Sequence, residues 1–296
     1  MVLTSPDGTA NKLILNCGCK INLRLKVTGK RPDKLHTLSS CFLFLEHPGD
    51  TLEFSHCAGP GIFFDCPGFP ELCGEKNLVY RAAALYAEKA GLAPAWKIVL
   101  HKHVPLAAGL GGGSAGAGGI LSLLNSIYHS FTPEELNAVA FSLGADVPFF
   151  LHRRAAWVTG AGEFFEEIPE LPPIPETLIV NPGFPVSAKW AYTRMAEELK
   201  TPDDAKFKEE FISGKISSWS DFCRNDLAPA LYEKFPLLVM MRSCLEELGA
   251  LAVQVSGSGS SLFALFEKDV PEKAAAFRRK FSNLENLRIF AKGTEL

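Results

Sequence analysis

The chain has 296 residues, of which 47% are hydrophobic and 21% charged, a composition typical of a globular protein with one large domain or two of ordinary size. A formal net charge of −3 argues against a nucleic-acid or membrane partner, and neither a secretory signal nor an apolar run of roughly 18 residues is found. The eight cysteines form no CxxC pair, so we expect free thiols in a cytoplasmic protein.

Up to residue 160 the chain alternates between stretches typical of strands and of helices. The helix predicted over 77–90 has Asn77 as its N-cap and Gly91 as its stop, and a later helix begins with Thr132-Pro133 and two acidic residues. Strands are predicted over 13–27, 39–45, 50–54, 96–104 and 155–158, and another helix follows a glycine-rich run that begins at Pro105.

The only proline-dense stretch, Ile168–Pro175, predicts a connection between two domains that cover residues 1–165 and 176–296. The second domain is expected to mix strands and helices. Strands are predicted over 178–181, 251–255 and 261–266, and helices over 188–199, 235–248 and 271–281. The fold class that follows from both halves is α+β.

The most informative segment is the glycine-rich run Pro105–Gly119, which lies between a predicted strand and an apolar helix. Backbone N–H groups converge at such a turn and the helix dipole favours negative charge, so the turn can hold a phosphate group. Gly116, Gly118 and Gly119 fall in the first helical turns, where each glycine costs about 1 kcal/mol relative to alanine. This cost indicates a close approach to the backbone, either by a phosphate-bearing ligand or by a neighbouring element in tight helix–strand packing.

Three known motifs share features with this run, and each lacks part of its context. The dinucleotide fingerprint GxGxxG needs a second strand that ends in an acidic residue about 20 residues later, and none is predicted there. The GxSxG elbow of hydrolases needs a late histidine, whereas the last histidine here is His152. The P-loop ends in Gly-Lys-Ser/Thr, and Gly113-Ser114-Ala115 lacks the lysine. A catalytic cation is therefore expected from outside the run.

Two further segments carry candidate catalytic groups. Lys20 and Asn22 alternate on one face of a predicted strand, between apolar neighbours. Asp146 lies inside the apolar run Leu143–Leu151, directly after a predicted helix. By residue type alone, such a lysine is more often a solvated side chain, and such an aspartate is often a capping residue.

Together these segments resemble the GHMP kinase superfamily, and within it the branch that acts on a diphosphocytidyl-methylerythritol in the non-mevalonate isoprenoid pathway. Lys20-Ile-Asn-Leu is similar to the AKINL signature, Pro105–Ala117 to the PxGxGLGGGSSxAA nucleotide loop, and Gly144–Phe150 to the GxDVPFF segment. Gly160–Glu163, Asn225–Leu227 and Ser256–Ser260 follow in the order of the family, so the resemblance covers nearly the whole chain.

The resemblance implies a ribosomal-protein-S5-like N-terminal domain and a ferredoxin-like C-terminal domain, with the site in the cleft between them. It implies transfer of the γ-phosphoryl group of ATP to the C2 hydroxyl of the small-molecule substrate, with Mg²⁺ as a further cofactor. Phosphoryl transfer depends mainly on positioning and charge stabilisation. In this family pattern, Lys20 stabilises the transferring group and Asp146 accepts or orients the hydroxyl proton.

The matched segments imply the remaining site residues. Asn22 and His36 are expected on the substrate side, His36 at the cytosine, and Ser114 is expected to place a hydroxyl on a phosphate or on Mg²⁺. The residues expected to bind ATP are Pro105, Leu106, Ala107, Ala108, Gly109, Leu110, Gly111, Gly112, Gly113, Ser114 and Ala115, with Asn77 near the adenine and Lys102 near the phosphates.

The sequence departs from the family pattern at two positions. Leu35 replaces the tyrosine expected to stack on cytosine, so Phe184 becomes the candidate for that stacking. Ala115 replaces the second serine of the loop, which removes one hydroxyl from the expected Mg²⁺ site. Two alternatives stay open: another GHMP kinase, such as a mevalonate or homoserine kinase, and a binding or regulatory protein on the same fold.

Overall fold

The computed structural model describes residues 3–4, 12–168, 171–195, 204–291 and 294–296. These residues form two compact units that interleave along the chain. The first unit contains the chain up to Cys19, Gly49–Val104 and Gly111–Arg153, and the second contains Lys20–Pro48, Pro105–Leu110 and the chain from Arg154 onward. The described residues of the proline-dense stretch, Ile168 and 171–175, belong to the second unit, and the family-level division into residues 1–165 and 176–296 stays a prediction.

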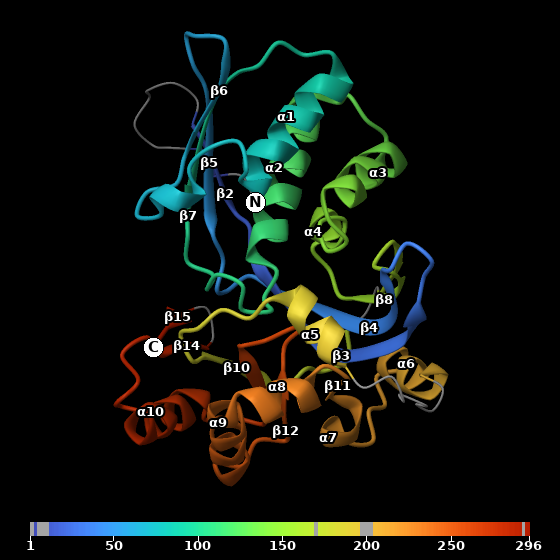
Figure 1. The fold of residues 1–296 in the computed structure, drawn as a ribbon, viewed down its shortest axis with the longest axis vertical. Helices are drawn as coiled ribbons and strands as arrows, with labels where there is room; N and C mark the ends of the chain where they lie inside the picture. Colours follow the sequence, from blue (N-terminus) through green and yellow to red (C-terminus); the bar gives the residue numbers. More distant parts are fainter. Residues whose placement is uncertain (1–2, 5–11, 169–170, 196–203, 292–293) are drawn as a thin grey trace. The chain divides into compact units, whose positions relative to one another are not determined.

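The first unit is a sheet with helices packed against it (Figure 1). In its described part the strands run in the order β1, β2, β5, β7, β6, and β6 pairs parallel with β7, whereas the other neighbours are antiparallel. The strands span Leu3–Thr4 (β1), Leu13–Asn16 (β2), Thr51–His56 (β5), Gly61–Asp65 (β6) and Ala95–His101 (β7). The helices span Pro70–Leu72 (η1), Leu78–Ala90 (α1), Gly112–Tyr128 (α2), Pro133–Leu143 (α3) and Phe149–His152 (α4).

Local sequence signals set the ends of two of these helices. The Asn77 side chain caps α1 by accepting a hydrogen bond of 2.9 Å from the Val79 N–H, and Gly91 ends the helix with a φ of 65°. Thr132 and Glu135 form a capping box at the start of α3. Each cap satisfies backbone groups that the helix itself leaves without partners. The predicted starts of both helices and the stop at Gly91 are confirmed.

Gly116, Gly118 and Gly119 of α2 face other parts of the first unit. A Cβ atom built on each of these three would lie closer to a neighbouring element than nearly all real Cβ atoms do. Of the two explanations for these glycines, tight packing is therefore the one that the structure supports. The nearest approaches are 2.7 Å at Gly116 (Val79 of α1), 2.7 Å at Gly118 (Phe150 of α4) and 3.1 Å at Gly119 (Leu15 of β2).

The second unit contains two sheets among its described residues. In one, the order is β12, β13, β10, β14, β15 with antiparallel neighbours, and in the other it is β11, β3, β4, β8, β9. The first of these sheets comprises Ala252–Val255 (β12), Leu262–Phe266 (β13), Glu176–Asn181 (β10), Arg288–Ala291 (β14) and Thr294–Glu295 (β15). The other comprises Arg224–Asn225 (β11), Cys19–Lys30 (β3), His36–Leu45 (β4), Ala156–Gly160 (β8) and Phe164–Glu167 (β9).

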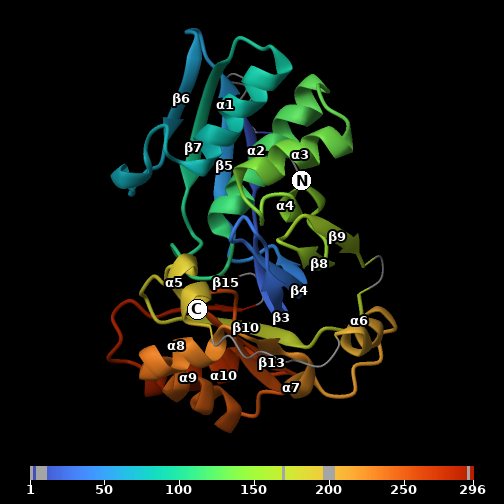
Figure 2. The ribbon, with the colours of Figure 1, turned by 45° about the vertical axis from the view of Figure 1, so that its right-hand side comes forward.

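Helices α8, α9 and α10 lie together on one side of the sheet formed by β12, β13, β10, β14 and β15 (Figure 2). Their apolar residues and those of the sheet form one buried cluster, which also includes Leu25 and Val27 of β3. Residues 19–27 of β3 are all buried, so Lys20, Arg24 and Lys26 are buried as well as the apolar residues, whereas Lys30 at the end of the strand is exposed. The helices of this unit are Ala188–Arg194 (α5), Ala205–Ile212 (α6), Trp219–Phe222 (α7), Ala228–Lys234 (α8), Pro236–Glu247 (α9) and Val270–Lys280 (α10).

The single strand predicted over 13–27 is wrong, because the chain turns between Asn16 and Cys19. Gly18 has a φ of 68° and its N–H donates to the Asn16 side-chain oxygen over 3.0 Å, so the strand is interrupted there. The helix predicted over 188–199 begins as expected, whereas its predicted residues 196–199 lie outside the described ranges. Within those ranges, no helix combines the length and apolar character needed to cross a membrane.

Candidate active site

The segment Ala107–Leu110 of the glycine-rich run is held by its backbone carbonyl groups. All four carbonyls accept a hydrogen bond, and the donors come from parts of the second unit that are far apart in the sequence. The conformation of this segment is therefore set by the protein before any ligand binds, which reduces the entropy lost on binding. The donors are the Val186 N–H to Ala107 (2.9 Å), the Ser261 N–H to Ala108 (3.1 Å), the Ser256 hydroxyl to Gly109 (2.9 Å) and the Lys20 N–H to Leu110 (2.9 Å).

Gly109 is a position at which only glycine fits. Its φ is 78°, and a Cβ atom there would lie 1.9 Å from the carbonyl oxygen of Ser256. That oxygen belongs to the main chain, so it cannot rotate away as a side chain can. The close approach joins the glycine-rich run to the second glycine-rich segment, Ser256–Ser260, which precedes β13.

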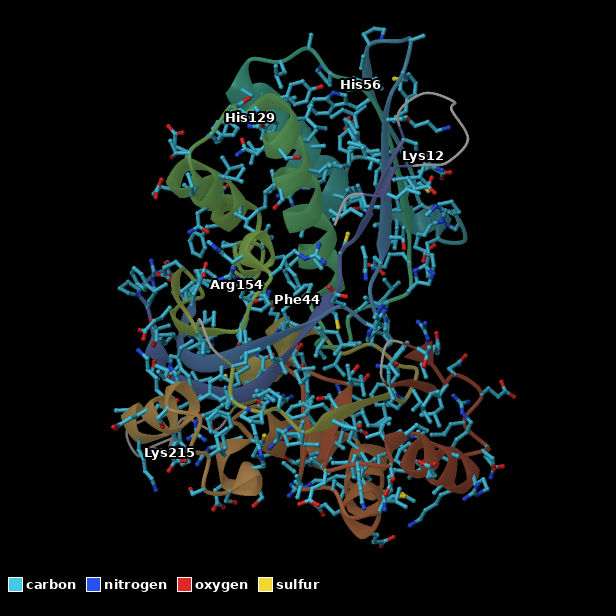
Figure 3. The ribbon with its side chains drawn as sticks, turned by 180° about the vertical axis from the view of Figure 1, so that it is seen from behind. Lys12, Phe44, His56, His129, Arg154 and Lys215 are labelled. Carbon is cyan, nitrogen blue, oxygen red and sulfur yellow. The ribbon has the colours of Figure 1, made fainter. Side chains whose placement is uncertain are left out.

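The start of α2 has one packed glycine and one open glycine. A Cβ atom at Gly112 would lie 2.9 Å from Val104, whereas a Cβ atom at Gly113 would meet nothing within 4 Å. Gly113 is exposed and Ser114 is half-buried, so this end of the helix is accessible. The other end lies at His129, which is labelled in Figure 3. An exposed helix N-terminus with its N–H groups and dipole is a suitable place for a phosphate group.

Lys20 and Asn22 form a buried pair on β3. The Lys20 ammonium donates to the Asn22 side-chain oxygen over 2.6 Å and lies 4.7 Å from the centre of the Phe42 ring. Only 4% of Lys20 and 1% of Asn22 is exposed. A Cβ atom on Gly257 would lie 3.1 Å from the Asn22 oxygen and 3.4 Å from the Lys20 nitrogen, so the second glycine-rich segment lies directly on this pair. Lys20 is therefore a fixed, buried charge rather than a solvated one.

Asp146 lies in the turn that connects α3 to α4 in the first unit, and it is half-buried. The turn is closed by a hydrogen bond of 3.0 Å from the Val147 N–H to the carbonyl of Gly144. Val147 is fully buried and anchors the turn beside α2. Its carbonyl oxygen lies close to Gly118 of that helix. The apolar residues around Asp146 thus fix its position, whereas Lys20 belongs to the second unit.

Lys102 forms a buried ion pair with Asp50, a residue that the sequence analysis did not single out. The other Asp50 carboxylate oxygen accepts hydrogen bonds of 2.8 Å from the N–H groups of His103 and Val104. Asp50 is fully buried and sits under Gly112, whose Cβ would lie 3.4 Å from it. The carboxylate therefore anchors the chain between β7 and the glycine-rich run. The register of the two strands accounts for this ion pair. Thr51 of β5 pairs with His101 of the antiparallel strand β7, and this brings the adjoining residues Asp50 and Lys102 together.

The Asn77 carboxamide is engaged at both ends. In addition to its capping bond, its NH₂ group donates to the carbonyl of Leu72 over 2.9 Å. This second bond ties the start of α1 to the short helix η1. The described contacts of Asn77 are thus those of a cap, and its position near the adenine stays a prediction.

His36 stacks on Tyr192, with ring centres 5.1 Å apart and an angle of 20° between the planes. Burial, and then the charge of Lys30, lowers the pKa of His36 below its usual 6.5. Tyr192 was not predicted as a site residue, although it is an aromatic residue in a predicted helix. Phe184 lies 4.9 Å from the Phe235 ring and packs against the core of the second unit.

The residues at the start of α2 suit a magnesium ion that takes most of its ligands from water and phosphate oxygens. Ser114 is half-buried and offers one hydroxyl oxygen. Ala115 offers none, because its methyl group is buried with 1% exposure. Among the described residues, no group of three or more His, Cys, Asp or Glu side chains is arranged to hold a metal ion. A metal ion here would therefore depend on the phosphates of the nucleotide.

Two family models match the chain: the GHMP kinases N terminal domain over residues 77–154 and the GHMP kinases C terminal domain over residues 207–283. The 4-diphosphocytidyl-2-C-methyl-D-erythritol kinase of Syntrophotalea carbinolica is 35% identical over 280 residues, which cover 92% of this chain and 95% of the relative. The enzyme of the same name from Nitratidesulfovibrio vulgaris strain Hildenborough is 36% identical over 269 residues, or 88% of this chain and 92% of the relative.

Solved structures agree with this relationship. A crystal structure of 4-(cytidine 5'-diphospho)-2C-methyl-D-erythritol kinase superposes with a TM-score of 0.77 and 31% identity, covering 95% of this chain and 99% of that one. A homoserine kinase from Cytophaga hutchinsonii has a TM-score of 0.76 at 17% identity over 100% of this chain and 98% of that chain, which is a likeness of fold alone. The predicted α+β, two-domain GHMP kinase fold is confirmed. The chain belongs to the GHMP kinase superfamily and, within it, to the family of the 4-diphosphocytidyl-2-C-methyl-D-erythritol kinases.

Proposed function

We propose that the chain transfers the γ-phosphoryl group of ATP to the C2 hydroxyl of 4-diphosphocytidyl-2-C-methyl-D-erythritol. GHMP kinases use ATP as their phosphate donor, and relatives that are 35% and 36% identical carry the name of this kinase. The observation that supports this chemistry is the buried Lys20–Asn22 pair on β3. Gly257 lies directly against the two side chains, and the backbone N–H of Lys20 donates to the carbonyl of Leu110. A fixed cation beside two glycine-rich segments suits a reaction that develops charge on phosphate oxygens.

In this proposal the backbone of the glycine-rich run binds the phosphates of ATP. Residues 107–110 are held rigid by their carbonyl groups, and the start of α2 offers N–H groups at the open position of Gly113. The Lys20 ammonium offsets negative charge on the transferring phosphoryl group. The Asp146 carboxylate orients the substrate hydroxyl and accepts its proton. Lys102 acts on the phosphates only indirectly, because its ammonium is paired with Asp50 beneath Gly112.

Mg²⁺, when bound with ATP, neutralises charge on the phosphate oxygens. The residue that would hold it is Ser114, whose half-buried hydroxyl lies in the first turn of α2. The single hydroxyl is sufficient because magnesium in kinases retains water and phosphate ligands. Ser114 therefore orients the ion, and the remaining charge stabilisation is left to Lys20.

The cytosine end of the substrate is proposed to bind at His36. Leu35 has no aromatic ring to stack on cytosine, and the Tyr192 ring beside His36 is proposed to supply one. Aromatic rings prefer an offset stack, as the His36 and Tyr192 rings show with their centres 5.1 Å apart. Asn22 and Phe184 remain proposed substrate contacts. The Phe184 ring already packs against the Phe235 ring, so we propose that only the edge of the Phe184 ring contacts the substrate. We further propose that the protein acts in the cytoplasm on small molecules, with no nucleic-acid or membrane partner.

One assay tests the proposed function. ATP turnover is measured with the cytidyl substrate, with mevalonate and with homoserine, each over the same range of concentration. Turnover with the cytidyl substrate alone is the expected result. Turnover with mevalonate or homoserine alone would overturn the proposal in favour of another GHMP kinase. ATP binding without turnover of any of the three would favour the binding or regulatory protein.

A further inference from the structure

A chain of hydrogen bonds leads from the Lys20 ammonium into the sheet of the second unit. It passes from β3 to β4 and returns to the backbone of β3. All of its members are buried, with exposed fractions of 4% or less. The bonds run from Lys20 Nζ to Asn22 Oδ1 (2.6 Å), from Asn22 Nδ2 to Ser40 Oγ (3.1 Å) and from Ser40 Oγ to the carbonyl of Arg24 (2.5 Å).

The carbonyl at the end fixes the direction of the whole chain. A carbonyl oxygen only accepts, so the single hydroxyl proton of Ser40 is used on Arg24. The Asn22 atom that faces Ser40 must then be a donor, which is the NH₂ group. The oxygen of the same amide consequently faces Lys20, whose ammonium only donates. The Ser40 hydroxyl and the Lys20 ammonium thus require the same orientation of the Asn22 amide and hold it from both ends.

The strands supply this arrangement by their alternation. Lys20, Asn22 and Arg24 are spaced by two residues along β3, so their side chains share a face. Ser40 and Phe42 are likewise spaced by two along β4, the neighbouring strand. Phe42 contacts the Lys20 ammonium directly, and Ser40 reaches it through Asn22. Two residues of β4 therefore hold the lysine, one by its ring and one through an amide.

We propose that Ser40 is a positioning residue for phosphoryl transfer, which acts on Lys20 through Asn22; the proposal rests on the proposed role of Lys20. Without the hydroxyl, the Asn22 NH₂ group loses its acceptor on β4, and the amide is held only by its bond to the ammonium. An amide that is held at one end can shift, and the ammonium that is bonded to it shifts with it. The ammonium then moves away from its position over Phe42, and charge on the transferring group is stabilised less well.

The test compares Ser40→Ala with a matched control one residue away. Ser39 is also buried, and its hydroxyl accepts a hydrogen bond of 3.0 Å from the Trp157 indole, so Ser39→Ala removes a comparable bond outside the chain to Lys20. Both variants are expected to lower the Tm. Only Ser40→Ala is expected to lower kcat, by about 10-fold, with the KM for ATP changed less than about twofold, as for a displaced catalytic group.

A Lys20→Met variant distinguishes an effect of Ser40 on the position of Lys20 from an effect of Ser40 on stability. In a Lys20→Met variant, the added Ser40→Ala change is expected to leave the residual kcat unaltered, because the group that it positions is absent. Ser40→Cys keeps the size of the side chain and replaces the hydroxyl with a weak donor, so it applies the same test if Ser40→Ala does not fold. It is expected to lower kcat in the same direction.

The outcomes are distinguishable. Wild-type kcat in folded Ser40→Ala or Ser40→Cys, or an equal loss of kcat in Ser39→Ala, overturns the positioning role. So does a loss that persists undiminished in the Lys20→Met background. If Lys20→Met itself retains wild-type kcat, the assignment of Lys20 in the proposed function fails, and the role of Ser40 fails with it.

Discussion

The hydroxyl of Ser256 donates a hydrogen bond of 2.9 Å to the carbonyl of Gly109, a residue 147 positions earlier in the chain. The same oxygen accepts a bond of 3.3 Å from the N–H of Asn22. One side chain thus connects the glycine-rich run, the second glycine-rich segment and the strand that carries Lys20. Because the partners are main-chain groups on two of these segments, the connection sets the backbone itself rather than a mobile side chain.

Alanine at two positions of the glycine-rich run, Gly109 and Gly113, is expected to change stability in opposite directions and to raise the KM for ATP in both cases. Gly109→Ala is expected to lower stability and raise the KM for ATP more than about 10-fold, since its Cβ would lie 1.9 Å from a main-chain oxygen and a positive φ costs a further 1–2 kcal/mol or so. Gly113→Ala is expected to raise the free energy of unfolding by up to about 1 kcal/mol. Its methyl group would nevertheless raise the KM for ATP several-fold, because it enters the open space at the start of α2.

Urea unfolding and steady-state kinetics of the two alanine variants check this pair. An unchanged KM for ATP in Gly113→Ala would show that the phosphates do not approach this turn. An unchanged Tm in Gly109→Ala would show that the Ser256 carbonyl moves aside. Neither result depends on the identity of the phosphate acceptor.

Lys20 and Asp146 are expected to govern kcat rather than the binding of ATP. Lys20→Met and Asp146→Asn keep the approximate size of each side chain and remove its charge. Each is expected to lower kcat by roughly 10²–10⁴-fold, the range for a lost acid–base or charge-stabilising group. Single-turnover kinetics and a fluorescent nucleotide titration separate the two steps. A variant with normal kcat, or one whose only defect is weaker ATP binding, would remove that residue from the catalytic role.

The Asp50–Lys102 pair is expected to contribute to stability. Lys102→Met leaves the fully buried Asp50 carboxylate without its cation, and breaking a buried pair in this way costs about 3–5 kcal/mol. The double variant Asp50→Asn/Lys102→Met is expected to recover part of this loss, because no buried charge remains and the amide oxygen still accepts from the N–H groups of His103 and Val104. Chemical unfolding of both variants measures the difference. Equal stability of the single variant and the wild type would show that Lys102 is free to act elsewhere.

The pKa of His36 predicts a pH dependence of stability. Burial, and then Lys30, lowers this pKa in the folded protein, so the unfolded chain binds the proton more readily. The contribution of His36 is therefore fully present above the ordinary pKa of 6.5 and is lost as the pH falls through the lower, folded value. His36→Gln is expected to flatten the fall in Tm between about pH 7 and pH 5. An NMR titration that gives His36 a pKa of 6.5 or higher would contradict this reading.

Much of the fold could be predicted from local signals. The caps at Asn77 and Thr132 and the stop at Gly91 are short-range hydrogen-bond patterns, so they are visible in the sequence. The break between β2 and β3 has an equally local signal, the bond from the Gly18 N–H to the Asn16 side chain, and the prediction of a single strand over 13–27 did not use it. The two-residue strand β11 was missed because its pairing with β3 joins segments about 200 residues apart.

The sequence by itself determined the family of this protein, the order of its motifs and the residue types available for phosphoryl transfer. Only the tertiary structure decided what surrounds them. It showed that Gly116, Gly118 and Gly119 serve packing, that Lys102 is paired with Asp50, and that the Ser40 hydroxyl accepts a hydrogen bond from the Asn22 amide beside Lys20. The physical reason is that a motif records neighbours along the chain, whereas burial, pairing and the direction of a hydrogen bond depend on neighbours in space. We propose that the glycine-rich run binds phosphate, and only the tertiary structure shows that a Cβ atom would clash with the main chain at Gly109 and meet nothing within 4 Å at Gly113.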